Sequence, residues 1–163
     1  PGNYREYFEL VAEYKTWLPV LGIQWDINVN GGEVAAQPDS YQAQLESHSA
    51  DIELKTGQMA ELTATFKNTS NNTWSNGIQS NYGAVRLGTY SPNDRASKFQ
   101  ADDWLSSNRV SGTGSNINHD GRLALSFNVL APDVPGVYYE SFRLVSEYVT
   151  WFGPSVTWKI EVI

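Results

Sequence analysis

The chain has 163 residues, of which 40% are hydrophobic and none is cysteine, and it carries a net charge of −7. This length fits one ordinary domain or one domain plus a fragment, and the apolar content excludes intrinsic disorder. The acidic balance excludes nucleic acid as a partner, the lack of cysteine excludes disulfides and thiolate metal sites, and no apolar run is long enough for direct membrane insertion.

The first residues of the chain recur near its end. Residues 1–17 match residues 135–151 at an offset of 134, with eleven of the seventeen positions identical. After a slip of one residue the match resumes, with residues 23–29 beside residues 156–162. Self-similarity of this kind indicates a repeat architecture.

Three segments follow from the repeat. We interpret residues 1–29 as the C-terminal strands of a preceding, incomplete copy, because the counterpart of residues 41–134 is missing ahead of Pro1. Residues 30–40 are small, polar and interrupted by Gly and Pro, which is typical of a linker. Residues 41–163 are the complete unit.

The complete unit is predicted to be all-β. Period-two alternation, typical of half-buried strands, occurs in residues 59–66, 123–129 and 156–162. Further candidate strands are residues 41–45, 52–54, 84–90, 108–110 and 138–145. Turn-forming clusters separate these segments, and no window shows a helical stripe. This number and spacing of strands predict a two-sheet sandwich.

The tail also has strand-like alternation, in residues 4–11 and 23–29. Two strands cannot bury an apolar face alone, so we expect another body to cover it. The body of a preceding copy is one candidate, and a neighbouring molecule's sheet, completed by strand addition, is the other. The candidate assembly residues are Phe8, Leu10, Trp17, Ile23, Trp25 and Ile27.

No constellation of catalytic residues stands out. His48 and His119 lie far apart without a second ligand at metal spacing, and we interpret them as surface histidines. The adjacent pair Asp102 and Asp103 points in diverging directions, which suits a solvated turn better than a glycosidase dyad. Residues 112–115 lack the following helix of a phosphate cradle. We therefore expect no enzyme activity, cofactor or metal.

Two regions carry candidate ligand contacts. The longest connection, residues 91–107, is either a recognition loop or a turn held by Asp94 and Arg95 whose aromatic residues belong to the core; we favour the second. In residues 138–152 the alternation places Tyr138 and Phe142 inward, whereas a connecting turn leaves two aromatic residues exposed. The candidate contacts are Phe99, Trp104, Tyr148 and Trp151.

Two covalent modifications remain open at this level. Asn68 and Asn71 each begin an N-glycosylation pattern, and the same cluster also makes a good turn without a sugar. A Lys–Asn isopeptide bond would depend on which residues are neighbours in space.

Several short motifs, taken in order, resemble the four-tryptophan immunoglobulin-like domain. They are residues 66–74, 85–89, 94–95, 104, 131–132, 135–138, 142–144 and 151–154. The family was first described in a selective-autophagy cargo receptor and is widespread as a repeated module of secreted or surface-anchored bacterial proteins. Ala64, Phe66 and Phe142 stand where the receptor has tryptophan, so the bacterial members are the more similar. The resemblance implies an immunoglobulin-like fold for residues 41–163.

The expected function is that of a non-catalytic structural or adhesive module of an exported cell-surface fibre or multidomain surface protein, with extracellular location. Its partners would be adjacent immunoglobulin-like domains or identical subunits. The alternative is an accessory module of a secreted hydrolase that binds carbohydrate or peptide. An enzyme in its own right ranks third.

Overall fold

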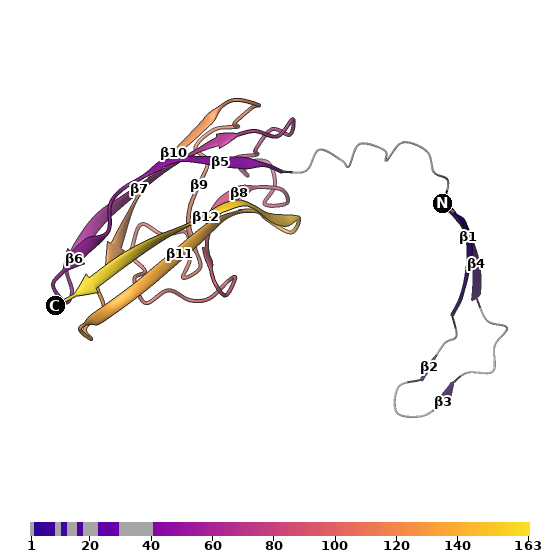
Figure 1. The fold of residues 1–163 in the computed structure, drawn as a ribbon, viewed down its shortest axis with the longest axis horizontal. Helices are drawn as coiled ribbons and strands as arrows, with labels where there is room; N and C mark the ends of the chain where they lie inside the picture. The colour runs from indigo at the N-terminus through magenta and orange to yellow at the C-terminus, as the bar shows by residue number, and fades with distance from the viewer. Residues whose placement is uncertain (1, 9–10, 13–15, 18–22, 30–40) are drawn as a thin grey trace. The chain divides into compact units, whose positions relative to one another are not determined.

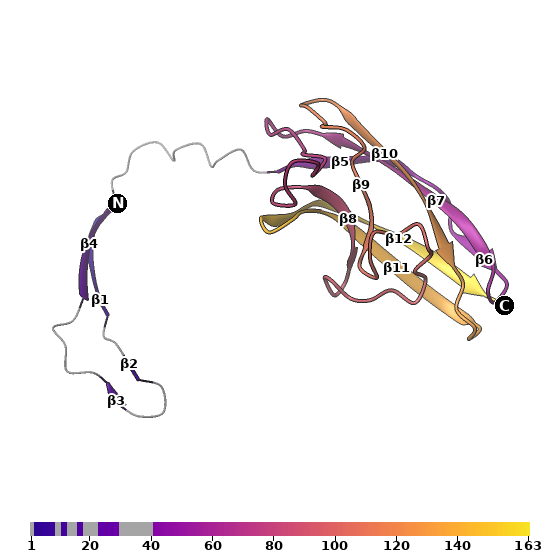
Figure 2. The ribbon, with the colours of Figure 1, turned by 180° about the vertical axis from the view of Figure 1, so that it is seen from behind.

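The computed structural model describes residues 2–8, 11–12, 16–17, 23–29 and 41–163. The chain divides into two compact units, Pro1–Pro38 and Asp39–Ile163, which we describe separately. In the described residues every regular element is a β-strand, and no helix could span a membrane. The strands and their labels can be followed in Figure 1 and, from behind, in Figure 2.

The larger unit is an immunoglobulin-like sandwich of two sheets. The smaller sheet is antiparallel, in the order β10-β7-β5, and consists of β5 (Ala43–His48), β7 (Met59–Asn68) and β10 (Arg122–Leu130). The larger sheet has the order β6-β12-β11-β8-β9 and consists of β6 (Ile52–Leu54), β8 (Val85–Tyr90), β9 (Arg109–Gly112), β11 (Gly136–Ser146) and β12 (Thr150–Val162). Only β6 runs parallel to its neighbour, β12. The prediction of an all-β two-sheet sandwich is confirmed.

Strand β12 begins earlier than the alternation predicted. Its first residues pair with the end of β11, where Val145 lies opposite Trp151. A register shift follows between Phe142 and Leu144, and it accommodates Gly153, whose φ is +68°. Bulges of this kind interrupt period-two alternation without ending a strand. Trp151 therefore lies on a strand, whereas Tyr148 lies in the predicted turn.

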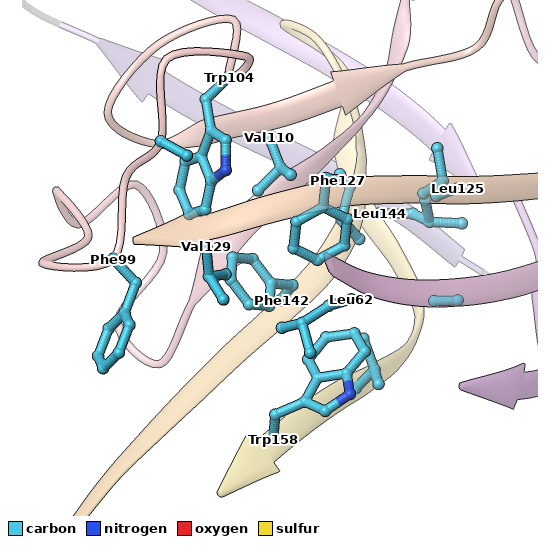
Figure 3. Packing of buried hydrophobic residues seen from close by; sticks show 14 of the residues in the cluster. Leu62, Phe99, Trp104, Val110, Leu125, Phe127, Val129, Phe142, Leu144 and Trp158 are labelled. Atoms are coloured by element: carbon cyan, nitrogen blue, oxygen red, sulfur yellow. The ribbon is translucent and has the colours of Figure 1, made fainter. Parts of the chain in front are cut away.

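Aromatic rings join the two sheets at the centre of the core (Figure 3). Phe127 projects from β10, and Phe142 and Trp158 project from β11 and β12. The three ring centroids lie 5.6–5.8 Å apart in edge-to-face geometry, and all three side chains are buried. Trp104, from the long loop, packs edge-on against Phe127 and Phe142. Edge-to-face pairs contribute about 0.5–1.5 kcal/mol each beyond burial.

A buried asparagine holds the loop that leaves β7. The Asn68 side-chain amide donates to the carbonyls of Asn72 and Ile117, and its oxygen accepts from the backbone N–H and the hydroxyl of Ser70. Both ends of the amide are thus satisfied inside the protein. Asn68 is therefore inaccessible to a glycan in the folded unit, whereas Asn71 is exposed.

The smaller unit forms a hairpin that repeats the end of the larger one. Strand β1 (Gly2–Phe8) pairs with β4 (Ile23–Val29), from Gly2 opposite Val29 to Phe8 opposite Ile23. The short strands β2 (Val11–Ala12) and β3 (Thr16–Trp17) pair beyond them. The equivalent positions of β11 and β12 pair in the same way, from Gly136 opposite Val162 to Phe142 opposite Val156. Sequence repeat and strand register therefore agree.

Two fully buried tryptophans, Trp74 and Trp158, should differ in the cost of their substitution. Trp158 Nε1 donates to the Ser49 carbonyl at 2.9 Å, whereas within the described residues no acceptor receives the Trp74 Nε1–H. Both side chains are fully buried, so Trp158→Phe and Trp74→Phe remove similar apolar volume. Trp158→Phe should lower the free energy of unfolding by about 1 kcal/mol more, since it alone loses a hydrogen bond. Urea unfolding followed by circular dichroism measures both; equal losses would contradict the assignment.

Candidate functional site at the β11–β12 hairpin

The turn between β11 and β12 is fixed by backbone bonds to a neighbouring loop. The Glu147 N–H donates to the Ala84 carbonyl, and the Gly83 N–H donates to the Glu147 carbonyl, both at 2.9 Å. Tyr148, at the tip, has a φ of +63° and is 78% exposed. A left-handed conformation is uncommon for a residue with a bulky side chain. The turn thus presents an aromatic ring to solvent from a rigid base.

A half-buried arginine crosses the base of this turn. Arg109, on β9, donates to both carboxylate oxygens of Glu147, at 2.6 and 3.2 Å, and also to Asp94. Arg86 lies 3.5 Å from Glu147 and donates to Asn81. Burial lowers the pKa of Arg109, but hydrogen bonds to Glu147 and Asp94 outweigh it and raise that pKa overall. The guanidinium therefore stays charged, and its charge is compensated locally.

On the outer face of the larger sheet, the Trp151 indole packs against Gly88 of β8, where a side chain would leave no room for it. A Cβ on Gly88 would meet Trp151 Cη2 at 2.7 Å, which is closer than a real contact. The Arg109 guanidinium lies 5.3 Å from the Trp151 ring centroid, within cation–π range. The Tyr90 ring is next, 6.3 Å from Trp151, and Arg143 covers it at 5.4 Å.

Two hollows flank the turn and share Arg109, Glu147 and Tyr148 as a common wall. The first, of about 320 Å³, extends over Leu105 and over polar side chains; these are Asn81, Arg86, Ser106 and Asn108. The second, of about 360 Å³, extends towards Trp151. Small-molecule sites start at roughly 300 Å³, so each hollow has room for one small unit of a ligand.

Two of the four candidate ligand contacts, Phe99 and Trp104, lie in the core, as the favoured interpretation of the loop predicted. Phe99 is fully buried and packs edge-on against Tyr138, at 5.2 Å. Trp104 is buried as well, and its Nε1–H donates to the Asn128 carbonyl at 2.6 Å. Neither ring presents a face to a ligand. The other two candidates, Tyr148 and Trp151, come together at the hollows just described.

The long loop between β8 and β9 is held by side-chain bonds. Arg95 and the Ser97 hydroxyl both donate to the buried Glu140 carboxylate, at 2.7 and 3.0 Å. Asp103 accepts from the backbone and the side-chain amide of Asn128. These contacts favour a structural role for the acidic pair and for most of the loop, whereas Asp94, Leu105, Ser106 and Asn108 line the hollows.

The remaining sequence candidates lie at the surface. The rings of His48 and His119 bond to the backbone carbonyls of Ser49 and Ser70, and both residues are exposed. Lys67 lies 2.7 Å from Asp120, and this hydrogen bond lowers the pKa of the Asp120 carboxyl. Across the described ranges no three His, Cys, Asp or Glu side chains gather as metal ligands.

Of the candidate assembly residues in the hairpin, the structure describes the side chains of two, Trp25 and Ile27. Trp25 is 59% exposed and Ile27 is 42% exposed on β4. Phe8, Trp17 and Ile23 lie on strands, but their side chains are outside the described set, as is Leu10 entirely.

Sequence reasoning missed Arg109, Glu147 and Gly88 as parts of this site. One signal was available for Glu147. The run Glu147-Tyr148-Val149-Thr150-Trp151 matches residues 13–17 at every position except Val149, which Lys15 replaces. An exposed turn that stays the same in two copies of a repeat points to a constraint other than core packing.

The chain matches no protein-family model and no curated protein. Three solved structures are similar in outline. The solution structure of the CARDB domain of PF1109 from Pyrococcus furiosus has a TM-score of 0.47 and 11% identity over 77% of this chain and 97% of that one. The crystal structure of domains 4 and 5 of the S-layer protein SbsC has a TM-score of 0.32 and 14% identity, over 88% of this chain and 59% of that one. A PapD-like domain of human CEP192 has a TM-score of 0.39 and 11% identity, over 82% of this chain and 92% of that one. We draw neither function nor partners from likenesses at this level.

Gly88→Ala should lift the Trp151 indole off the sheet. The added methyl group needs the space of Trp151 Cη2, and overpacking costs about 1–3 kcal/mol. Oxidative footprinting read by mass spectrometry should show Trp151 oxidised faster, and thermal unfolding should show a lower Tm. Gly114→Ala is the matched control, because a Cβ there meets nothing within 4 Å. If the two variants behave alike, Gly88 does not seat the indole.

Proposed function

We propose that this chain is a structural repeat module of an exported surface protein or fibre, related to the bacterial four-tryptophan immunoglobulin-like domains. Neighbouring copies of the same sandwich would be its partners. The observation that carries the proposal is the hairpin of residues 1–29, which has the strand register of β11 and β12. A chain that contains the end of one sandwich and the whole of another is organised as a tandem array.

The exposed apolar residues of the hairpin support this role. Trp25 and Ile27 correspond to Trp158 and Ile160 of the complete unit. Both counterparts are fully buried there, beneath the smaller sheet, whereas Trp25 is 59% and Ile27 is 42% exposed. Exposed apolar side chains with buried counterparts call for a covering surface, and the β5, β7 and β10 strands of another copy have the matching shape.

Glu6 indicates that the covering body carries a positive charge. It corresponds to Glu140, whose buried carboxylate is paired with Arg95 at 2.7 Å. A buried carboxylate without a partner is strongly unfavourable. The body that covers the hairpin must therefore supply a cation, as the β8–β9 loop of the complete unit does.

Completing the hairpin with its own repeat tests the proposal. Residues 41–134 placed directly ahead of Pro1 restore, by the offset of 134, a full unit before the linker. In this two-unit chain, oxidation of Trp25 should slow to the rate of Trp158, because both would then be buried. In the 163-residue chain Trp25 should stay reactive at low concentration.

Two substitutions in the two-unit chain test whether Trp25 is protected by packing inside a completed sandwich or merely by the presence of a neighbouring domain. Ile27→Asp places a charge at a position whose counterpart, Ile160, is fully buried, and should return Trp25 to fast oxidation. Arg5→Tyr, which introduces the residue of its outward-pointing counterpart Tyr139, should leave Trp25 protected. Unchanged reactivity of Trp25 in the two-unit chain would rule out the repeat interpretation.

The exported location has its own test. An antibody raised against residues 41–163 should label intact cells of the source organism without permeabilisation. Labelling only after permeabilisation would contradict a surface role.

A further inference from the structure

The comparison of the two copies singles out Tyr148 among the exposed residues. The inward side chains Tyr138, Glu140, Phe142 and Leu144 of β11 are identical in residues 1–17, whereas several large, strongly exposed side chains differ. The outward positions Val137, Tyr139 and Val149 are replaced by Asn3, Arg5 and Lys15. Tyr148 is as exposed as these residues, yet its counterpart is also a tyrosine, Tyr14.

Fold stability does not explain this tyrosine. Among the residues that the structure describes, no hydrogen bond, ring contact or ion pair involves the Tyr148 side chain. Its left-handed backbone would suit Gly or Asn better than a bulky residue. An exposed aromatic ring held in a strained turn is a candidate binding element.

The surroundings of Tyr148 favour an uncharged, hydroxyl-rich ligand. The two cations that line the hollows, Arg86 and Arg109, are matched by the two carboxylates of Asp94 and Glu147. The lining of the two hollows taken together therefore has no net charge. The side chains offer amide and hydroxyl groups, which both donate and accept hydrogen bonds, and carboxylates, which accept them. Sugar hydroxyls have the same dual capacity, and the apolar face of a pyranose ring packs against an aromatic ring.

We propose that the β11–β12 turn binds a neutral oligosaccharide. One pyranose ring stacks on Tyr148, and the neighbouring units of the chain occupy the two hollows on either side of the wall formed by Arg109 and Glu147. Trp151, beneath Arg109, closes the floor of the second hollow and positions the guanidinium. The site goes beyond the structural role and is independent of what covers residues 1–29.

The 163-residue protein is to be screened on a glycan array and by affinity electrophoresis in gels that contain soluble β-glucan, xylan, galactomannan or starch. We expect retardation by at least one of these neutral polysaccharides. The retardation should persist at about 0.5 M NaCl, because screening does not weaken an uncharged contact. No retardation and no array signal, or binding to anionic glycans alone, would overturn the proposal.

Three variants locate the site. Tyr148→Ala removes the stacking ring and should weaken retardation at least tenfold, whereas Tyr148→Phe keeps the ring and should retain most of it. Tyr139→Ala is the matched control, since Tyr139 is 67% exposed on the same strand pair but lies away from the hollows. Undiminished binding by Tyr148→Ala would contradict the assignment. Negative results here would leave the Trp25 protection experiment unaffected.

Discussion

The contact between Phe127 of the smaller sheet and Phe142 and Trp158 of the larger one is the interaction on which this structure depends. The chain has no cysteine, so no disulfide joins the sheets, and edge-to-face aromatic packing takes that place. Trp104 extends the cluster into the long loop and ties that loop to β10 through its indole N–H. One cluster therefore fixes both the spacing of the sheets and the course of their longest connection.

The same constraint explains how the two copies of the repeat have diverged. Residues that face the cluster are identical between positions 1–17 and 135–151, because a core packed at high density tolerates little change of volume. Strongly exposed outward positions carry no such packing restriction, and at one of them Tyr139 is replaced by Arg5. An exposed residue that is the same in both copies, such as Tyr148, is therefore kept for a reason other than core packing.

Local patterns predicted the strands well because half-buried strands alternate along the sequence itself. Strand β6 matches its prediction residue for residue, whereas β12 was predicted six residues too short, since the bulge at Gly153 breaks the alternation. The site was less predictable. Arg109 meets Glu147 only because β9, β8 and β11 are neighbours in one sheet, and strand order is a property of the whole fold. For Phe99 and Trp104 the sequence left a recognition loop and a core role open and favoured the core role, which their burial supports.

The proposed assembly and the proposed ligand binding would use different parts of the sandwich. The face of the hairpin proposed to be covered is the inward face, represented by Trp25 and Ile27, whereas the proposed sugar site lies at the turn and on the outward face, at Tyr148 and Trp151. Burying the first face in a completed sandwich leaves the second open. If each copy keeps the Glu-Tyr-x-Thr-Trp turn, as residues 13–17 do, a tandem array would present one saccharide site per repeat. Weak individual contacts would then add up along a polysaccharide through effective concentration, which gives a structural repeat a reason to preserve an exposed aromatic ring.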